Sequence, residues 1–513
     1  RGVKSLALRP RPSAPLASNA PLLRGLLAPS ALRFRAFSMI VHESPHPEVE
    51  IPKKTIWEIV EEQASVNGDK TAFICGLTHD RITFGELYES ARRLAVALAQ
   101  DGVGKGDVHV TRDDECGVHG TDALTTSLLR LFFSELSKRD FDSFNFEKID
   151  PELNVMLPFS SGTTGIPKGV ALSARNMLSN ALQVDQVEDL AGYSLGLLPF
   201  FHIYGMMLLH LSLYQGAAKV ILPRFDPETF LNALSVYKIR AAHIAPPVAL
   251  FLAHHPLVEK YDLSATEFLV SGGAPMGKEV EALVKDRLKV TVKQAYGMTE
   301  ASPAVNYAED GYPDLYVIDY VERVQGSVGR LLPNTQLRVK CTSTDVDLPV
   351  GEHGELLYKG PQVMIGYSNN VDANKNVFTE DRFLRTGDIG YIDEDGFVFV
   401  VDRVKELIKY KGHQVAPAEL EDVLNNHPQI SDACCVRGQD AFGQEIPKAY
   451  VVLKDPTNAA KLTKEDVMDF VASKVAPFKK VREVEFIGAI PKSATGKILR
   501  RELQVHENKN HTK

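Results

Sequence analysis

Short apolar runs alternate with segments of helical spacing between about residues 155 and 300. The apolar runs are bounded by turn residues and read "VMLPF" at 155–159, "AKVIL" at 218–222, "EFLVS" at 267–271 and "VTVKQ" at 290–294. Segments with helical periodicity lie between them, at 173–182, 226–237 and 278–288. This alternation predicts parallel sheets covered by helices, and Ser173 and Asp226 stand where helix N-caps are expected.

The pattern changes near residue 326. Up to residue 402 it consists of β segments punctuated by glycine, such as "GELLYKG" at 354–360 and "GFVFVVD" at 396–402, the latter entered through a "DEDG" turn. Beyond residue 402, helices at 417–427 and 464–475 accompany strands at 432–438 and 448–454. The predicted fold is α/β, with a large N-terminal domain (43–402) of parallel-sheet subdomains and a small β subdomain, then a small α+β C-terminal domain (403–513).

One stretch, residues 195–214, carries no charge and is long enough to span a bilayer. Pro199, His202, Gly205 and His210 interrupt it. We therefore expect a strand followed by a helix buried in a large core, and no transmembrane span.

Composition narrows the class of protein. The 513 residues are 44% hydrophobic and 24% charged with a net charge of -8, which indicates a multidomain globular chain with no bulk attraction to nucleic acid. The five cysteines are scattered without a metal-ligand rhythm, which favours a reducing compartment over a disulfide scaffold. Nothing in the composition indicates an oligomeric state.

The N-terminal segment 1–42 differs from the rest of the chain. It contains seven Lys or Arg residues and no acid, because the first carboxylate is Glu43. This composition is typical of a mitochondrial transit peptide, with a disordered tail and a cytoplasmic protein as the alternatives.

The stretch "SSGTTGIPKGV" at 160–170 is rich in glycine and hydroxyl residues and contains one lysine. Backbone N–H groups and hydroxyls of such a loop can surround phosphate oxygens, because glycine removes the Cβ atoms that would block their approach. The stretch lacks the Walker spacing, and no G-x-G-x-x-G opens a helix, so neither P-loop phosphoryl transfer nor dinucleotide-dependent hydride transfer is indicated.

This loop is one of seven motifs that occur in a fixed order: "SSGTTGIPKGV", "PFFHIYG", "QAYGMTE", "GELLYKG", "RTGD", "DRVKELIKYKG" and "PKSATGK". Together they resemble the adenylate-forming superfamily of acyl-CoA synthetases, luciferases and peptide-synthetase adenylation domains, and within it the 4-coumarate–CoA ligase-like branch. The resemblance implies an ATP-dependent carboxylic acid:CoA ligase that uses ATP, Mg²⁺ and coenzyme A. It also implies a mobile C-terminal domain with a hinge at Lys405.

The resemblance assigns roles to particular residues. Lys497, His202, Thr299 and Glu300 are the implied catalytic group, and Glu300 is the implied Mg²⁺ ligand. The implied nucleotide and coenzyme A contacts are Ser160, Ser161, Gly162, Thr163, Thr164, Gly165, Lys168, Gly273, Ala274, Pro275, Tyr296, Gly297, Asp388, Arg403, Lys409, Lys411, Gly412 and Gln414. The acyl pocket is expected near Phe201, Tyr204, Gly297, Pro303 and Ala304.

Two departures from the family pattern bear on activity and substrate. Residues 107–150 replace several dozen residues that relatives have before the phosphate loop, which is explained equally by a faulty gene model and by a shortened enzyme. "GELLYKG" lacks a cysteine common in plant 4-coumarate–CoA ligases, and "SPAVNY" differs from their ring-pocket sequence. A fatty or aryl acid is therefore favoured over a strict hydroxycinnamate. The alternatives are a luciferase-like oxygenase and an inactive nucleotide- or acyl-binding protein.

Overall fold

The computed structural model describes residues 39–104, 107, 148–160, 167–190, 192–274, 276–308, 326–411, 413–440, 443–455, 462–493 and 497–510. Most of the predicted leader, and most of the segment 107–150 that stands in place of the relatives' residues, lies outside these ranges. Residues 39–42 are described, and the backbone N–H of Ile40 donates to Asp347 Oδ2 at 3.2 Å. Strand β1 (His42–Glu43) pairs antiparallel with β14, so the segment just before Glu43 already belongs to the folded part.

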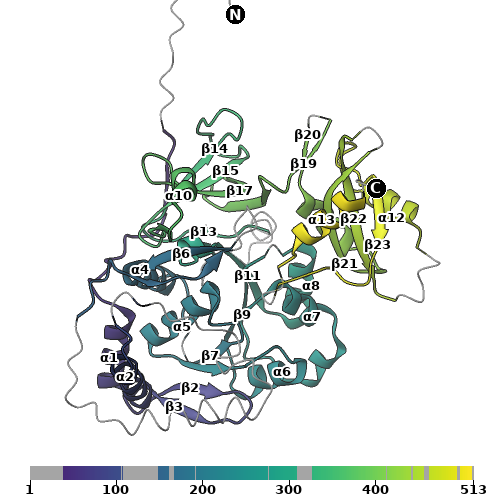
Figure 1. Ribbon diagram of the computed structural model, residues 1–513. Helices are drawn as coiled ribbons and strands as arrows, with labels where there is room; N and C mark the ends of the chain where they lie inside the picture. The colour runs from purple at the N-terminus through teal and green to yellow at the C-terminus, as the bar shows by residue number, and fades with distance from the viewer. Residues whose placement is uncertain are drawn as a thin grey trace, which may run out of the picture. The chain divides into compact units, whose positions relative to one another are not determined.

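Two sheets of the large domain contain the predicted parallel strands (Figure 1). One sheet has the order β3-β2-β8-β7, with bounds Arg81–Thr83, Thr71–Cys75, Ala218–Ile221 and Tyr193–Gly196. The other has the order β13-β12-β11-β10-β9, with bounds Arg330–Leu331, Ala304–Tyr307, Thr291–Gly297, Phe268–Ser271 and Ala241–Ile244. Neighbours are parallel in the pairs β2–β8, β7–β8, β9–β10 and β10–β11. The predicted α/β class is confirmed.

The prediction for "VMLPF" is wrong in one respect. Its residues form parts of β4 (Asn154–Met156) and β5 (Phe159–Ser160), and both pair antiparallel with β6 (Lys168–Ser173). Strand β16 (Gly366–Tyr367) adds to the other edge of β6, also antiparallel. The chain reverses direction between β5 and β6, so these strands run opposite to each other rather than through a helical crossover.

Helices cover the sheets of the large domain. Their bounds are Ile56–Asn67 (α1), Phe84–Gln100 (α2), Ala174–Asp185 (α4), Ile203–Gln215 (α5), Pro227–Val236 (α6), Pro246–His254 (α7) and Lys278–Leu288 (α8), with a short 3-10 helix, η1, at Pro256–Lys260. Side chains of α6, α7 and α8 share one buried cluster with Val220 of β8 and Leu269 of β10. This core therefore joins the two sheets.

The uncharged stretch 195–214 forms the end of β7 and most of α5, as predicted. Helix α5 is buried on several faces, and its buried side chains include Met207, Leu208 and Leu211. Gly205 is required there, because a Cβ at this position would lie 2.3 Å from the carbonyl oxygen of Pro199. No helix within the described ranges is both long and apolar enough to cross a bilayer.

The β subdomain is an antiparallel sheet of order β1-β14-β15-β17-β18. The bounds of its other strands are Gln336–Lys340 (β14), Gly354–Lys359 (β15), Leu384–Ile392 (β17) and Val398–Arg403 (β18), and helix α10 spans Val371–Val377. The predicted "DEDG" turn joins β17 to β18, with Gly396 at φ +83°.

The C-terminal part has its own buried core, which includes Ile408, Leu420, Val451 and Val467. It contains a hairpin, β19 (Ile408–Tyr410) and β20 (His413–Val415), and a sheet of order β21-β22-β23 at Ile430–Gln439, Glu445–Leu453 and Glu483–Phe486. Its helices are α11 (Pro417–Asn425), α12 (Lys464–Ala472) and α13 (Arg500–Asn510). The predicted boundary at 402–403 lies at the end of β18 and stays a prediction.

Both predicted N-caps are confirmed. Ser173 caps α4, and its hydroxyl accepts from Asn176 N at 3.0 Å. Asp226 caps α6, where its Oδ2 accepts from Thr229 N at 2.9 Å and from the Thr229 hydroxyl at 2.7 Å.

We expect Asp226→Ala to lower the free energy of unfolding by about 1 kcal/mol, because an N-terminal N–H of α6 loses its acceptor. Urea denaturation at pH 7 measures the change. Asp226→Asn is the control and should retain most of the stability, because its amide oxygen still accepts. Equal stability of the alanine variant and the native chain would contradict the role of the cap.

Candidate active site

A buried carboxylate, Asp388 on β17, lies where the β subdomain meets the end of β11. The Tyr296 hydroxyl donates to Asp388 Oδ2 at 2.6 Å, and Arg403 Nε lies 3.3 Å from Oδ1. Arg403 is the register partner of Asp388 on β18. Burial raises the pKa of Asp388, while the charge of Arg403 and the Tyr296 hydrogen bond oppose that rise. The structure thus brings together three residues predicted to contact the nucleotide.

Glu300 occupies a second part of the site, in the short 3-10 helix η2 (Thr299–Ala301). It is buried, and its Oε1 accepts a hydrogen bond of 2.8 Å from the Tyr367 hydroxyl. The ammonium of Lys168 lies 4.8 Å from the centre of the Tyr367 ring. Tyr367 therefore links the predicted phosphate-binding lysine to the predicted magnesium ligand.

The residues present fit the implied magnesium ion. Mg²⁺ is commonly held by one or two carboxylates together with substrate phosphates and waters. Glu300 supplies one buried carboxylate, and Thr299 is its neighbour in η2. Lys168 is the first residue of β6, the strand that follows the phosphate loop. Phosphates bound in this loop would therefore lie near a basic residue, Lys168, and an acidic residue, Glu300.

Lys497 completes the charged group. Burial and the nearby charge of Arg403 lower the pKa of Lys497 to about 8, although the charges of Asp388, Glu406 and Glu300 act in the opposite direction. A buried ammonium in this setting is partly deprotonated just above neutral pH. The fold therefore brings Lys497 into electrostatic range of residues more than 90 positions away in the sequence.

His202 precedes α5 and acts as its N-cap. Its Nδ1 accepts a 3.3 Å hydrogen bond from the backbone N–H of Tyr204, which leaves the proton of the neutral ring on Nε2. Burial lowers the pKa of His202, and the charge of Lys497 lowers it further. A neutral imidazole is therefore expected at neutral pH.

Close packing shapes the ends of β10 and β11. A Cβ on Gly297 would lie 2.2 Å from the carbonyl oxygen of Pro303, and a Cβ on Gly272 would lie 2.9 Å from Cε1 of the Tyr204 ring. Gly273 has φ +85° and Ala274 follows it after the end of β10. Only glycine, which has no Cβ, fits at positions 272 and 297 without displacing these neighbours.

The remaining acyl-pocket candidates differ in exposure. Tyr204 and Ala304 are buried, whereas Phe201 is partly exposed, with 36% of its surface accessible. Ala304 on β12 is fixed by Asn180, which exchanges two hydrogen bonds with its backbone at 2.8 and 3.0 Å. The acyl pocket itself stays a prediction.

The predicted hairpin residues form a separate group. Lys409 and Gln414 are register partners of β19 and β20, and Lys409 N donates to Glu445 at 2.7 Å. The ammonium of Lys411 lies 5.3 Å from the centre of the Tyr410 ring. Within the described ranges these contacts stay inside the C-terminal part, so they do not join the hairpin to Asp388.

Some predicted residues lie outside the described ranges, namely 161–165, Pro275 and Gly412. Ser160, at the end of β5, is described and pairs in register with Lys168. The structure therefore describes only the two ends of the phosphate loop.

Sequence reasoning missed Tyr367. It lies in "MIGYSNN", outside the seven motifs, and reaches Glu300 because β16 pairs with β6. No pattern in the sequence marks that pairing.

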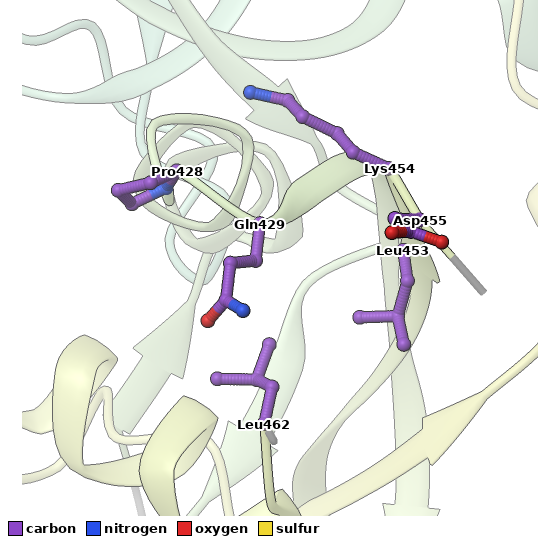
Figure 2. A pocket seen from close by; sticks show the side chains of 6 residues that line it. All are labelled: Pro428, Gln429, Leu453, Lys454, Asp455 and Leu462. Carbon is purple, nitrogen blue, oxygen red and sulfur yellow. The ribbon is translucent and has the colours of Figure 1, made fainter. Parts of the chain in front are cut away.

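A small cavity of about 180 Å³ lies away from these residues. Figure 2 shows its lining side chains, Pro428, Gln429, Leu453, Lys454, Asp455 and Leu462, all in the C-terminal part. None of them is a predicted site residue. Its volume is below that typical of sites for small organic ligands.

The chain belongs to the AMP-binding enzyme family. The model of that family matches residues 111–368, and the model of the AMP-binding enzyme C-terminal domain matches residues 419–497. The resemblance stated from the seven motifs is confirmed.

Two curated relatives of this chain are named as 4-coumarate–CoA ligases. The probable 4-coumarate–CoA ligase 1 of Dictyostelium discoideum is 44% identical over 391 residues, which cover 74% of this chain and 68% of that protein. The 4-coumarate–CoA ligase 2 of Narcissus pseudonarcissus is 41% identical over 382 residues, covering 72% of this chain and 66% of that protein.

Solved structures show the fold. ATP-bound MatB from Rhodopseudomonas palustris has a TM-score of 0.76 at 22% identity, covering 88% of this chain and 98% of that one. The o-succinylbenzoate CoA synthetase of Bacillus subtilis, in complex with an acyl-adenylate intermediate, has a TM-score of 0.73 at 24% identity and the same coverage. The predicted fold of a large and a small domain is confirmed.

We expect Tyr367→Phe to lower the free energy of unfolding by roughly 1–3 kcal/mol, because buried Glu300 Oε1 loses its hydrogen-bond donor. Urea denaturation measures the loss. Tyr391→Phe is the control, because Tyr391 is a partly buried tyrosine whose ring stacks on Phe399, and that stacking survives the change. A Tyr367→Phe variant as stable as the control would contradict the contribution of this hydrogen bond.

Proposed function

We propose that this protein joins an aryl carboxylic acid to coenzyme A in two steps. In the first, a carboxylate oxygen attacks the α-phosphorus of ATP, the bond to the β-phosphate breaks, and pyrophosphate leaves. In the second, the thiol sulfur of coenzyme A attacks the acyl carbon, AMP leaves, and the thiol gives up its proton. The predicted enzyme class is confirmed at the level of the family: the chain is an AMP-forming acid–thiol ligase.

The observation that carries this proposal is the convergence of Lys497 on Asp388, Arg403 and Glu300. Two anions must approach each other in the first step, so positive charge is needed where they meet. The Lys497 ammonium supplies that charge between the acid and the α-phosphate. Magnesium bound at Glu300 would offset the charge of the β- and γ-phosphates.

The other residues bind and orient the nucleotide. Asp388 accepts hydrogen bonds from the ribose hydroxyls, and Arg403 holds Asp388 in its ionised form. The Tyr296 ring stacks on adenine, beside the backbone of Gly273 and Ala274. The loop residues Ser160 to Lys168 surround the phosphates.

His202 and the hairpin act on the acyl group and on coenzyme A. Neutral His202 forms part of the wall of the carboxylate pocket and separates it from the thiol path. Lys409, Lys411 and Gln414 face the thiol path after the small domain turns about Lys405.

The relatives' names support an aryl acid over a fatty acid, because both relatives described above are named for 4-coumarate. The sequence difference at "SPAVNY" supports a ring pocket that is not limited to hydroxycinnamates. The basic, acid-free segment 1–42 supports a mitochondrial location.

A panel of hydroxycinnamic, benzoic and medium-chain fatty acids tests the substrate class by ATP–pyrophosphate exchange, with thioester formation measured after coenzyme A is added. We expect exchange with aryl acids and coenzyme A-dependent product. ATP binding without exchange would indicate an inactive binding protein, and oxygen uptake without thioester would indicate an oxygenase. Preference for the fatty acids would overturn the aryl assignment.

Lys497→Ala should lower the rate of adenylate formation by roughly 100-fold or more, because the positive charge between the two anions is lost. Thioester formation from a supplied acyl-adenylate should be retained. Lys492→Ala is the matched control, because Lys492 lies in the same motif and its ammonium pairs with Asp432 at 2.6 Å. If Lys497→Ala lost both half-reactions while Lys492→Ala kept them, the proposed role of Lys497 would be contradicted.

The kcat/KM for ATP–pyrophosphate exchange should fall as pH rises through about 8, because the Lys497 ammonium loses its proton there. The charged form is present below this pKa, so the loss is on the alkaline side. The Lys497→Arg variant should lack this limb, because a guanidinium stays charged at these pH values. An exchange rate that rises from pH 8 to pH 9 in the native enzyme would be inconsistent with an active ammonium.

A further inference from the structure

Two acidic side chains flank the segment that joins β18 to the C-terminal part. Strand β18 ends at Arg403, and the backbone N–H groups of Glu406 and Leu407 donate to the carbonyl of Arg403 at 3.0 and 3.2 Å. Lys405, the hinge that the family resemblance implies, lies inside this turn. Asp402 stands before the turn and Glu406 is part of it.

Asp402 caps a helix that begins on the other side of the turn. Its Oδ2 accepts a 3.0 Å hydrogen bond from the backbone N–H of Ala418 in the first turn of α11. The N-cap residue of that helix, Ala416, provides no side-chain acceptor. A helix is normally capped by a side chain from its own N-terminal segment. Here the capping carboxylate comes instead from a residue of β18.

The Asp402 carboxylate is mostly ionised at pH 7. Burial of Asp402 raises its pKa, and the charge of Glu406 adds to the rise. The Ala418 hydrogen bond, the charge of Arg500 and the backbone N–H of Arg403 act in the opposite direction, and the resulting pKa is about 6. Asp402 Oδ1 accepts from Arg403 N at 2.7 Å. A negative charge at the helix N-terminus is favourable, so the contact is stronger than a neutral cap.

A row of alternating charges continues from the turn to the segment that carries Lys497. Arg403 Nη1 lies 4.0 Å from Glu406 Oε1, and the other oxygen of Glu406 is bound by Arg500. Arg500 binds both oxygens of Glu421 on α11 at 2.7 Å, and its Nε donates to the carbonyl of Cys435 at 3.0 Å.

Arg500 follows Lys497 by three positions and opens α13. Through Arg500 and Glu421, the segment that carries Lys497 is fixed to α11. A contact that holds α11 in place relative to β18 therefore also keeps Lys497 within electrostatic range of Asp388.

Resting on the function proposed above, we propose that Asp402 is a positioning residue for the adenylation half-reaction. By capping α11 from across the turn, it holds the small domain where Lys497 meets the acid and the α-phosphate. Rotation about Lys405 leaves Asp402 behind and carries Ala418 away, so the cap breaks. The thioester half-reaction, which in this scheme follows that rotation, does not use it.

The variant Asp402→Ala tests this. We expect kcat for ATP–pyrophosphate exchange to fall about tenfold, with KM for ATP changed little, because the nucleotide contacts stay in place. Thioester formation from a supplied acyl-adenylate should stay at the native rate or rise. Asp402→Asn should recover part of the exchange rate, because an amide oxygen can still accept from Ala418.

Thr463→Ala is the matched control. Thr463 caps α12 in the same C-terminal part through Asp466 N at 3.1 Å, and this cap does not cross the turn. It should affect both half-reactions alike. If Asp402→Ala slows both half-reactions equally, as this control does, or changes neither, the positioning role is overturned.

Trypsin provides a readout that does not depend on activity. Cleavage after Arg403 or Lys405 should be faster in Asp402→Ala than in the native chain and in Thr463→Ala, because the turn is released when the cap is lost. Unchanged cleavage would overturn the proposal. A native enzyme that adenylates no acid would count against the proposed function, while the cleavage rates would still decide the role of Asp402.

Discussion

The buried carboxylate of Asp388 is the constraint on which the rest of the site depends. A carboxylate removed from water loses several kcal/mol of solvation unless charged and hydrogen-bonding partners replace it. Here the partners are Arg403, opposite it on β18, and the Tyr296 hydroxyl at the end of β11. The β subdomain and the mostly parallel sheet are therefore tied together at the point where the nucleotide is proposed to bind.

The same charge balance extends to the small domain. Lys497 approaches a place that already contains Arg403, and the resulting repulsion adds to the effect of burial on its pKa, while three carboxylates offset it. In the proposed mechanism a substrate acid and a triphosphate add negative charge at this place, which favours the ammonium. The position of the small domain and the chemistry are thus coupled through electrostatics, and Asp402 at the turn is the contact that links them.

The one wrong feature of the predicted fold has a simple origin. "VMLPF" and "KGVALS" are apolar runs bounded by turn residues, and such runs look alike whether the strands are parallel or antiparallel. Direction is decided by the connection, and here the loop 161–167 contains no helical pattern that could make a crossover. The predicted helices were more accurate, because α6 and α8 have periodic apolar positions and α6 also has a capping residue, Asp226, at its start.

The sequence by itself determined the family, the order of the motifs, two of the helix caps and the buried character of residues 195–214. These follow from local chemistry: glycine where backbones approach closely, capping side chains at helix starts, and apolar periodicity. Only the tertiary structure decided that Tyr367 reaches Glu300, that Lys497 acts on Asp388, and that Asp402 caps α11. Those contacts join residues 16 to 109 positions apart. Their energies depend on burial and on distances between charges, which no linear pattern contains.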